Sequence, residues 1–203
     1  MNSKNLLIVF VKNPVQGKAK TRLAATIGAE AALDVYKELI SITEKATSKI
    51  SDCDLHVYFS SEINESLWPG KMKFIQQGAD LGERMYSAFH HGFELGYHRI
   101  VGVGSDLPDL NSETISKGIS ALSTNDVAFG PSDDGGYYLI GMSQPTPCIF
   151  ENKKWSTESL LDETTRELSG KSISYSLLET LNDVDTIEDL RSSSLSDKFS
   201  EYL

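Results

Sequence analysis

Residues 99–110 read Arg-Ile-Val-Gly-Val-Gly-Ser-Asp-Leu-Pro-Asp-Leu, and this stretch decides how the chain is expected to fold. It begins as a short apolar run, which is typical of a strand buried inside a sheet. Gly102 and Gly104 remove side chains where a ligand or another backbone could approach closely. Asp106 follows at the carboxyl end of the run, where open α/β sheets bind ligands, and Pro108 prevents the strand from continuing. The same pattern also fits an aspartate in a turn before a helix.

Apolar runs and helical patterns alternate on either side of this stretch. The runs that predict strands cover 6–11, 54–60, 73–76, 126–130, 137–142 and, late in the chain, 173–178. Helical patterns cover 21–25 and 29–50 with a break near Gly28, then 80–95, 112–122, 156–168 with Ser156 as its cap, and a polar terminal helix or frayed tail over 187–203. The alternation up to residue 126 predicts βα units and a mainly parallel sheet of the α/β class. The two closely spaced strands over 126–142 predict an antiparallel element, so we expect a mixed sheet.

The composition is that of an ordinary globular protein. The 203 residues are 39% hydrophobic and 24% charged, and this length favours a single domain over residues 1–203. A formal net charge of -10 argues against a nucleic-acid partner, because proteins that bind duplexes usually carry a basic face. The two cysteines, Cys53 and Cys148, fit no zinc spacing and predict a reduced, cytoplasmic protein.

No segment of the sequence reads as a targeting or membrane signal. Residues 1–5 lead directly into the six-residue apolar run at 6–11, which is too short for the apolar region of a signal peptide. No apolar run approaches the roughly 18 residues that a membrane helix needs. We therefore expect no membrane span.

A basic loop covers residues 12–23, between the first strand and the first helix. Four of its twelve residues are basic, namely Lys12, Lys18, Lys20 and Arg22. Backbone N–H groups at such a position favour an anion, and these side chains would add charge-assisted hydrogen bonds to phosphate oxygens. The loop is not a P-loop, since that motif needs Gly where Lys12 stands and Ser or Thr where Ala19 stands. A phosphate-binding loop is the prediction, and a solvated basic loop is the alternative.

A second motif covers residues 77–85 and contains two glycines around the start of a helix. Asp80 is a plausible N-cap, and Arg84 lies in the first turn. We take Gly78 and Asp80 as candidate nucleotide-binding residues. A loop that simply caps its helix is the alternative.

A third motif, at residues 130–138, places two carboxylates and two glycines between neighbouring strands. Asp-Gly is a strong hairpin signal, yet a two-residue turn needs only one glycine. We therefore predict that Gly135, Gly136 and Tyr137 bind an acceptor, with Asp134 as a catalytic base or acceptor anchor. A hairpin turn without further function is the alternative.

A fourth motif covers residues 182–186, Asn-Asp-Val-Asp-Thr, and its two carboxylates, Asp183 and Asp185, point to the same side if the backbone is extended. Magnesium in proteins is usually held by one or two carboxylates together with substrate phosphates and waters. Asp106 with Asp185 or Asp183 would provide such a site for Mg²⁺ or Mn²⁺, and Asp185 is our choice. A helix N-cap before residue 187 is the alternative.

Taken together, the motifs at 12–23, 77–85, 104–110, 130–141 and 183–190 resemble a known family. They are similar to the bacterial GT-A-type transferases known as arsenosugar-biosynthesis-type or radical-SAM-associated glycosyltransferases. That family is largely a domain of unknown function. It is related to the nucleotidyltransferases of molybdenum-cofactor guanylylation and 2-phospholactate guanylylation.

This resemblance implies a nucleotide-diphospho-sugar transferase fold, which is a three-layer α/β/α sandwich with a mixed central sheet. It implies that the loop after the first strand cradles a nucleotide, and that Asp106 corresponds to the metal-binding Asp-x-Asp region of glycosyltransferases. The second aspartate is shifted here to Asp109, with Pro108 in its place, which resembles the nucleotidyltransferase form. Residues 19–23 are closer to the phospholactate guanylyltransferase version.

The resulting hypothesis is a metal-dependent transferase that uses a nucleotide-activated donor, foremost a nucleotide sugar, and a small-molecule acceptor. The basic loop would offset the phosphate charge, and the cation on Asp106 and Asp185 would offset more of it. Nucleotidyl transfer from a nucleoside triphosphate to a phosphorylated acceptor, with release of pyrophosphate, is the nearer alternative. A non-catalytic nucleotide-binding module is the more distant one. The base, the sugar, the acceptor and the oligomeric state stay open.

Overall fold

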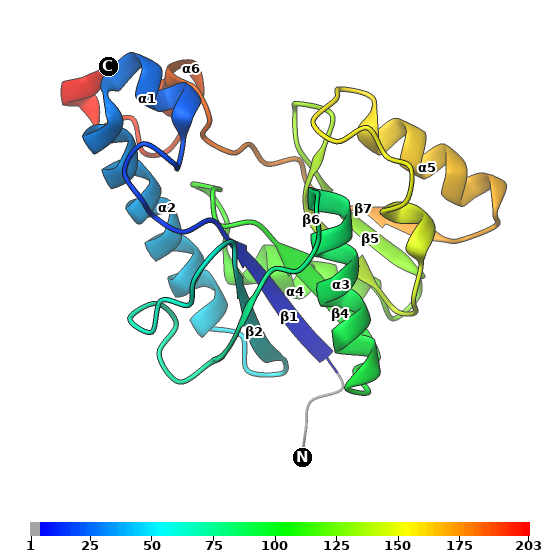
Figure 1. Ribbon diagram of the computed structural model, residues 1–203. Coiled ribbons are helices and arrows are strands. Elements are labelled where there is room, and N and C mark those ends of the chain that lie inside the picture. Colours follow the sequence, from blue (N-terminus) through cyan, green and yellow to red (C-terminus); the bar gives the residue numbers. More distant parts are fainter. Residues whose placement is uncertain (1–4) are drawn as a thin grey trace.

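The computed structural model describes residues 5–203, so the first four residues of the segment considered above as a leader lie outside the described residues. Within that range the strands form a seven-stranded sheet in the order β3-β2-β1-β4-β6-β5-β7 (Figure 1). The strands are β1 (Asn5–Val11), β2 (Asp54–Phe59), β3 (Met72–Ile75), β4 (Arg99–Val103), β5 (Val127–Pro131), β6 (Tyr137–Met142) and β7 (Tyr175–Leu177). The helices are α1 (Thr21–Ile27), α2 (Ala29–Ser48), α3 (Leu81–Glu94), α4 (Ser112–Ala121), α5 (Leu160–Gly170) and α6 (Ile187–Ser192).

The sheet is mixed, as the sequence predicts. Strand β6 runs antiparallel to both of its neighbours, β4 and β5. The other strand pairs are parallel. The antiparallel strand is the second of the two closely spaced strands that break the βα alternation, so this prediction is confirmed.

Helices cover both faces of the sheet because the side chains of β1 alternate between two apolar cores. Leu7 and Val9 face a core that contains residues of α2 and α4, whereas Leu6 and Ile8 face one that contains residues of α3 and α5. Figure 1 shows α3 in front of the sheet and α4 behind it. The three-layer α/β/α sandwich is therefore confirmed.

The strand order creates a crevice at the carboxyl end of the sheet. From β1 the chain proceeds outward to β2 and β3, and then returns to form β4 on the other side of β1. Such a reversal separates the loops that follow the two central strands, and open α/β sheets bind their ligands at this point. The loop after β1 begins at Lys12, and the loop after β4 contains Asp106.

Two predictions near the end of the chain differ from the structure: the helix start expected at Ser156, and the terminal segment expected as a polar helix or a frayed tail. Helix α5 begins at Leu160, and Ser156 does not cap it, because Ser156 adopts a left-handed backbone conformation (φ 61°) in the preceding loop. The terminal segment is not a long helix. Helix α6 ends at Ser192, and the chain continues through turns to a short 3-10 helix, Ser200–Tyr202, while Leu195 and Phe199 pack into the core.

The break between the first two helices is confirmed at Gly28, which has φ 88° and ends α1 immediately before α2 begins. Among the helices of residues 5–203, none combines the length and apolar character needed to cross a bilayer.

Candidate functional site

Three carboxylates converge at the crevice between β1 and β4. Asp106 comes from the loop after β4, and Asp183 and Asp185 come from the segment that leads into α6. One carboxylate oxygen from each lies within 4.8 Å of the others. The backbone N–H of Val184 donates a hydrogen bond of 3.2 Å to the carbonyl oxygen of Asp106, so the two segments are held together between these side chains.

The carboxylates of Asp183 and Asp185 do not cap the helix that follows. Thr186 is the N-cap of α6, and its side chain accepts a hydrogen bond from the backbone N–H of Asp189. Asp189 in turn accepts hydrogen bonds from the backbone N–H groups of Asp185 and Thr186, which completes a capping box. The helix N-cap that the fourth motif offered as the alternative is therefore present, but Thr186 supplies it, and the carboxylates of Asp183 and Asp185 belong to the cluster instead.

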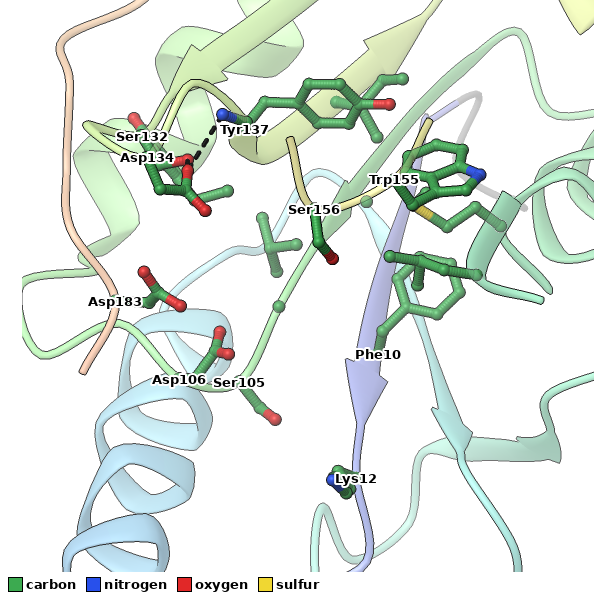
Figure 2. A pocket seen from close by; sticks show the side chains of 18 of the residues that line it. Phe10, Lys12, Ser105, Asp106, Ser132, Asp134, Tyr137, Trp155, Ser156 and Asp183 are labelled. Carbon is green, nitrogen blue, oxygen red and sulfur yellow. Dashed lines mark hydrogen bonds between the residues drawn. The ribbon is translucent and has the colours of Figure 1, made fainter. Parts of the chain in front are cut away.

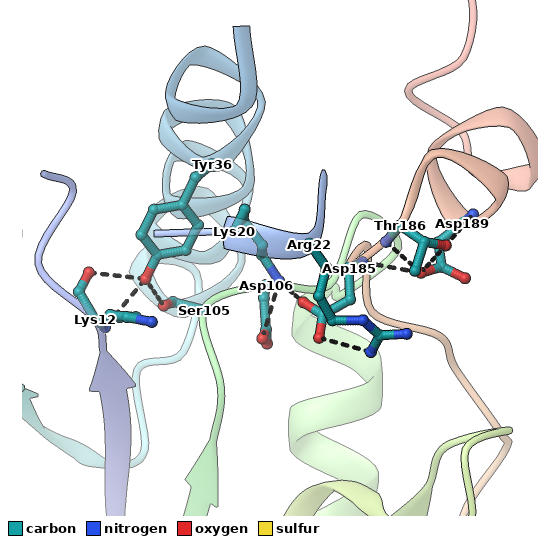
Figure 3. A network of polar contacts seen from close by, with 9 residues as sticks. All are labelled: Lys12, Lys20, Arg22, Tyr36, Ser105, Asp106, Asp185, Thr186 and Asp189. Carbon is teal, nitrogen blue, oxygen red and sulfur yellow. Dashed lines mark hydrogen bonds and ion pairs between the residues drawn. The ribbon is translucent and has the colours of Figure 1, made fainter. Parts of the chain in front are cut away.

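Lys20 is the buried cation of this cluster. Its ammonium lies 2.7 Å from Asp185 and 3.3 Å from Asp106, and its side chain is only 5% exposed. The left-handed backbone of Lys20 (φ 48°), just before α1 begins, turns the side chain toward these carboxylates. Arg22 lies farther out, 3.8 Å from Asp185 and 72% exposed (Figure 3). The ion pair places a positive group where two acidic side chains meet.

Tyr36 of α2 connects the loops that follow β1 and β4. Its hydroxyl accepts a hydrogen bond from the backbone N–H of Lys12 and donates one to the Lys12 carbonyl, at 3.0 and 2.8 Å. It also hydrogen bonds with the Ser105 hydroxyl at 3.0 Å. Burial raises the pKa of Tyr36 to about 12, so the hydroxyl stays protonated and can keep these partners. Tyr36 fixes the two loops relative to each other (Figure 3).

The charges of the cluster change the acidity of its members. Burial raises the pKa of Asp183 to about 6, and the neighbouring Asp106 and Asp185 carboxylates raise it as well. Burial alone would lower the pKa of the Lys20 ammonium, but Asp106 and Asp185 raise it above its ordinary value. Lys20 forms ion pairs with Asp106 and Asp185 but not with Asp183, so the negative charge of Asp183 is the least neutralised of the three.

Replacing Asp183 by asparagine is expected to stabilise the metal-free protein by about 1–3 kcal/mol at pH 7. The folded-state pKa of about 6 lies above the ordinary value of 3.8, so ionisation of Asp183 costs stability above pH 6, and this cost disappears as the pH falls toward 4. The advantage of the variant should shrink over the same range. Urea unfolding at pH 7 and pH 4 measures it, with Asp109→Asn as the control because Asp109 is exposed on the loop after Asp106. Equal stability of the variant and the parent at pH 7 would contradict the expectation.

Two cavities meet at the carboxylates. The larger has a volume of about 530 Å³ and the smaller about 250 Å³. Both are bordered by Lys12, Tyr36, Asp106 and Asp185. In Figure 2 the larger cavity has Asp106, Asp183 and Asp134 toward one side and the rings of Phe10, Tyr137 and Trp155 toward the other.

The predicted site residues divide between these cavities and other places. Lys12 borders both cavities, Lys20 and Arg22 border the smaller one, and the carboxylates together with Asp134, Gly136 and Tyr137 border the larger one. The predicted residues that border neither cavity are Lys18, Gly78, Asp80 and Gly135. The binding roles of all these residues stay predictions. The structure brings the residues that border a cavity together, and it places the other four outside both cavities.

Asp80 and Gly135 have structural positions that explain their residue types. The Asp80 side chain accepts a hydrogen bond from the backbone N–H of Glu83 at 2.9 Å, so it caps α3. Gly135 has φ 82°, and any side chain there would collide with the backbone of Glu158. In the second motif, Arg84 reaches the cavity instead, and its Nε donates to the carbonyl of Gly78 at 3.1 Å.

The hairpin loop between β5 and β6 carries Asp134 to the edge of the larger cavity. The Asp134 carboxylate accepts hydrogen bonds from the Ser132 hydroxyl and the Gly136 backbone N–H. The third motif is thus a hairpin turn, as its alternative interpretation holds, and it also brings Asp134 to the cavity that the carboxylate cluster borders. The hydrogen bonds hold one carboxylate oxygen and orient the group.

Several residues of the site carried no recognisable signal in the sequence. Tyr36 lies on the apolar stripe of α2 and reads as a core residue. Asn13 is buried, and its amide donates to the carbonyl of Glu62 while its oxygen accepts from the Ser61 backbone, which fixes the basic loop against the end of β2. Trp155 lies in an irregular loop and borders the larger cavity.

The donor set of the cluster fits a hard divalent cation. Three carboxylates offer oxygen ligands, which are the ligands that Mg²⁺ takes and that also suit Mn²⁺. The Lys20 ammonium already lies between two of these carboxylates, which shows that their arrangement favours a positive charge. Asp106, Asp183 and Asp185 are therefore the residues that could hold such an ion.

Known structures share this fold. A protein from Desulfovibrio desulfuricans G20, provisionally described as a nucleotide-diphospho-sugar transferase, is 31% identical, with 98% of each chain covered and a TM-score of 0.88. The inositol-1-phosphate CTP transferase of T. maritima has a TM-score of 0.61 at 13% identity, over 97% of this chain and 95% of that one. The 4-diphosphocytidyl-2C-methyl-D-erythritol synthase of Anaerococcus prevotii DSM 20548 has a TM-score of 0.61 at 11% identity, over 92% of each chain.

The fold and the site thus define a class, the transferases with the nucleotide-diphospho-sugar transferase fold. A family described as an uncharacterized protein conserved in bacteria (DUF2064) matches residues 43–157, more than half of the chain. The chain belongs to this family, and the resemblance noted in the sequence is confirmed. No curated protein is significantly similar to the chain in sequence.

Proposed function

We propose that this protein is a metal-dependent transferase that moves a glycosyl group from a nucleotide sugar to a small-molecule acceptor. One observation carries the proposal. Three carboxylates lie beside a pocket bordered by basic side chains, at the crevice where the strand order of the sheet reverses. Ligands of open α/β sheets bind at this point. A diphosphate needs both cationic side chains and a cation shared with carboxylates, and the crevice offers both.

The basic pocket is where the phosphates of the donor would lie. Lys12, Lys20 and Arg22 border it, together with Asp106 and Asp185. A divalent cation bound by the carboxylates would supply Lewis-acid polarisation of the leaving phosphate oxygen. Lys20 can donate hydrogen bonds to phosphate oxygens once its carboxylate partners share another cation, and Arg22 is exposed and free to reach the outer phosphate.

The acceptor would lie in the larger cavity, with its hydroxyl toward the carboxylates. The hydroxyl oxygen forms a bond to the transferred glycosyl carbon, the bond from that carbon to the phosphate oxygen breaks, and its electron pair leaves with the nucleoside diphosphate. The hydroxyl proton passes to a carboxylate at the cavity edge. Asp134 is our candidate base, since two hydrogen bonds orient it.

Nucleotidyl transfer is the second candidate function, and the position of Asp109 favours it. Asp109 is exposed and does not belong to the carboxylate cluster, so the loop after β4 contributes Asp106 alone to the cluster. This departs from the Asp-x-Asp arrangement of glycosyltransferases. In nucleotidyl transfer the same cluster would face a departing pyrophosphate.

The two reactions differ in their products, so one experiment separates them. The protein is incubated with Mn²⁺, a panel of nucleoside triphosphates and nucleotide sugars, and pooled alcohol and sugar-phosphate acceptors. Release of nucleoside diphosphate from a nucleotide sugar supports glycosyl transfer, and release of pyrophosphate supports nucleotidyl transfer. Nucleotide binding without either product would support a non-catalytic binding module. Absence of metal-dependent nucleotide binding would overturn the proposal.

A further inference from the structure

The larger cavity has two chemically different halves. One half is bordered by the carboxylates of the site. The other half is bordered by three aromatic rings from separate parts of the chain, Phe10 of β1, Tyr137 of β6 and Trp155 of the loop before α5 (Figure 2). Met85 and Ile140 also border the cavity. An aromatic wall of this kind suits a flat ring, because ring faces stack and exclude water.

The aromatic half is a rigid, preformed wall. A side chain at Gly82 would lie 2.7 Å from the Trp155 indole nitrogen, so the indole rests directly on the first turn of α3. In the first turn of α5, which follows this loop, the backbone N–H of Leu161 donates to the carbonyl of Gly135 at 3.0 Å. The rings of Tyr137 and Trp155 meet edge to face, with centroids 6.4 Å apart. The loop is thus fixed on both sides of the cavity.

The floor of the aromatic half lacks a side chain. Gly102 of β4 borders the cavity there, and a Cβ at this position would lie 2.9 Å from the ring of Phe89 and 3.2 Å from that of Phe10. A larger residue would therefore push against the rings of Phe89 and Phe10. Glycine lets both rings pack directly on β4 at the border of the cavity.

Positive charge is divided unequally between the two cavities. The smaller is bordered by Lys12, Lys20 and Arg22, and suits phosphates. The larger has Arg84 and Lys12 at its border, and the Nε of Arg84 is already hydrogen bonded to the carbonyl of Gly78. Because Asp106 and Asp185 border both cavities, a molecule in the larger cavity and phosphates in the smaller one would meet at these carboxylates.

We propose that the aromatic half binds the acceptor, and that this acceptor is an uncharged alcohol with a flat apolar ring. The inference rests on the proposed transferase function, since it assigns the acceptor class of the same site. The ring lies against Trp155 and Tyr137, and the hydroxyl extends toward Asp134 and Asp183. An aryl alcohol fits this wall better than a polyol, whose hydroxyl groups would lose water against aromatic carbon.

Trp155 fluorescence provides a direct test. The chain has two tryptophans. Trp68 is buried, donates a hydrogen bond to the Thr47 hydroxyl and does not border the cavity. In the variant Trp68→Phe the emission therefore comes from Trp155 alone. Titration with 2-phenylethanol in the presence of Mn²⁺ and UDP should give a saturable change in emission, at a concentration at least tenfold lower than any change with methyl β-D-glucoside. Equal responses, or a stronger response to the glucoside, would overturn the inference.

Calorimetry on Trp155→Ala separates this inference from the proposed function. We expect the variant to lose at least tenfold in affinity for 2-phenylethanol and to keep its affinity for Mn²⁺-nucleotide, while Trp155→Phe keeps most of both. Tyr202→Ala, an exposed aromatic residue at the end of the chain, is the matched control and should change neither. Thermal unfolding confirms that each variant is folded.

Each remaining outcome distinguishes the two proposals. If nucleotide binding persists but 2-phenylethanol does not bind the parent protein, the acceptor class is wrong and the transferase proposal stands. If uridine alone saturates the Trp155 signal and competes with 2-phenylethanol, the rings hold the donor's base and the inference is overturned. If the parent protein binds no nucleotide with Mn²⁺, the proposed function itself fails.

Discussion

Asp106→Asn is expected to weaken Mn²⁺-dependent nucleotide binding by a factor of ten or more, roughly 1.4 kcal/mol or above. Asp106 is the member of the carboxylate cluster that comes from the loop after β4, and it stands at the border of both cavities. The amide keeps the shape of the side chain and removes the charge that both Lys20 and a divalent cation need. Titration calorimetry with UDP, GDP and CTP, each with Mn²⁺ and with a chelator, measures the effect.

Asp109→Asn is the matched control for this variant. It makes the same chemical change three residues further along, on a side chain that is exposed and outside the cluster. It should leave binding unchanged. If the parent protein binds nucleotide equally well with and without metal, and Asp106→Asn matches it, the metal-dependent mechanism is wrong.

Lys20→Met is expected to lower the free energy of unfolding of the metal-free protein by about 2–3 kcal/mol. Methionine keeps the length of the side chain but leaves Asp106 and Asp185 without their buried counter-charge. The loss is smaller than for a fully buried pair, because these carboxylates are 37% and 40% exposed and water screens part of the repulsion. Urea unfolding without metal measures it.

Mn²⁺ should increase the free energy of unfolding more in Lys20→Met than in the parent protein. In the variant the ion neutralises the carboxylate charge that Lys20 neutralises in the parent. Lys18→Met is the control. Lys18 belongs to the same basic loop but is exposed and borders neither cavity, so its removal should change neither stability nor the response to Mn²⁺. An equal gain from Mn²⁺ in the parent and in Lys20→Met would show that the cation does not bind at this cluster.

Much of the sheet could be predicted because each strand carries its own local signal. The apolar run of β1 and the glycine-thinned run of β4 are buried strands by composition, and the Asp-Gly pair before β6 predicts the hairpin that makes the sheet mixed. The start of α5 could not be predicted this way. Serine is a good N-cap by type, but at Ser156 the chain turns through a left-handed conformation next to Trp155, and the packing of Trp155 against Gly82 is a contact between distant segments.

The site could be predicted in its acidic residues and less well in its basic ones. Asp106 and the Asp183–Asp185 pair follow apolar or strand-like segments, so their position at the sheet edge follows from topology. Lys12, Lys18, Lys20 and Arg22 look equivalent in the sequence, whereas in the structure Lys20 alone among them is buried. That difference comes from the left-handed backbone of Lys20 just before α1, which no local sequence pattern predicts.

The segment at residues 182–199 crosses the carboxyl edge of the sheet from the β7 side back to α1 and α2 (Figure 1). It is fastened at one end by Asn182, whose amide donates to Asp133, and at the other by the 2.6 Å ion pair of Lys198 with Glu38. A ribosome that has released everything up to residue 181 has therefore made all seven strands but only one of the three carboxylates. The carboxylate cluster can therefore assemble only after this segment has been synthesised and has crossed the edge of the sheet, although every strand of the sheet comes earlier in the chain.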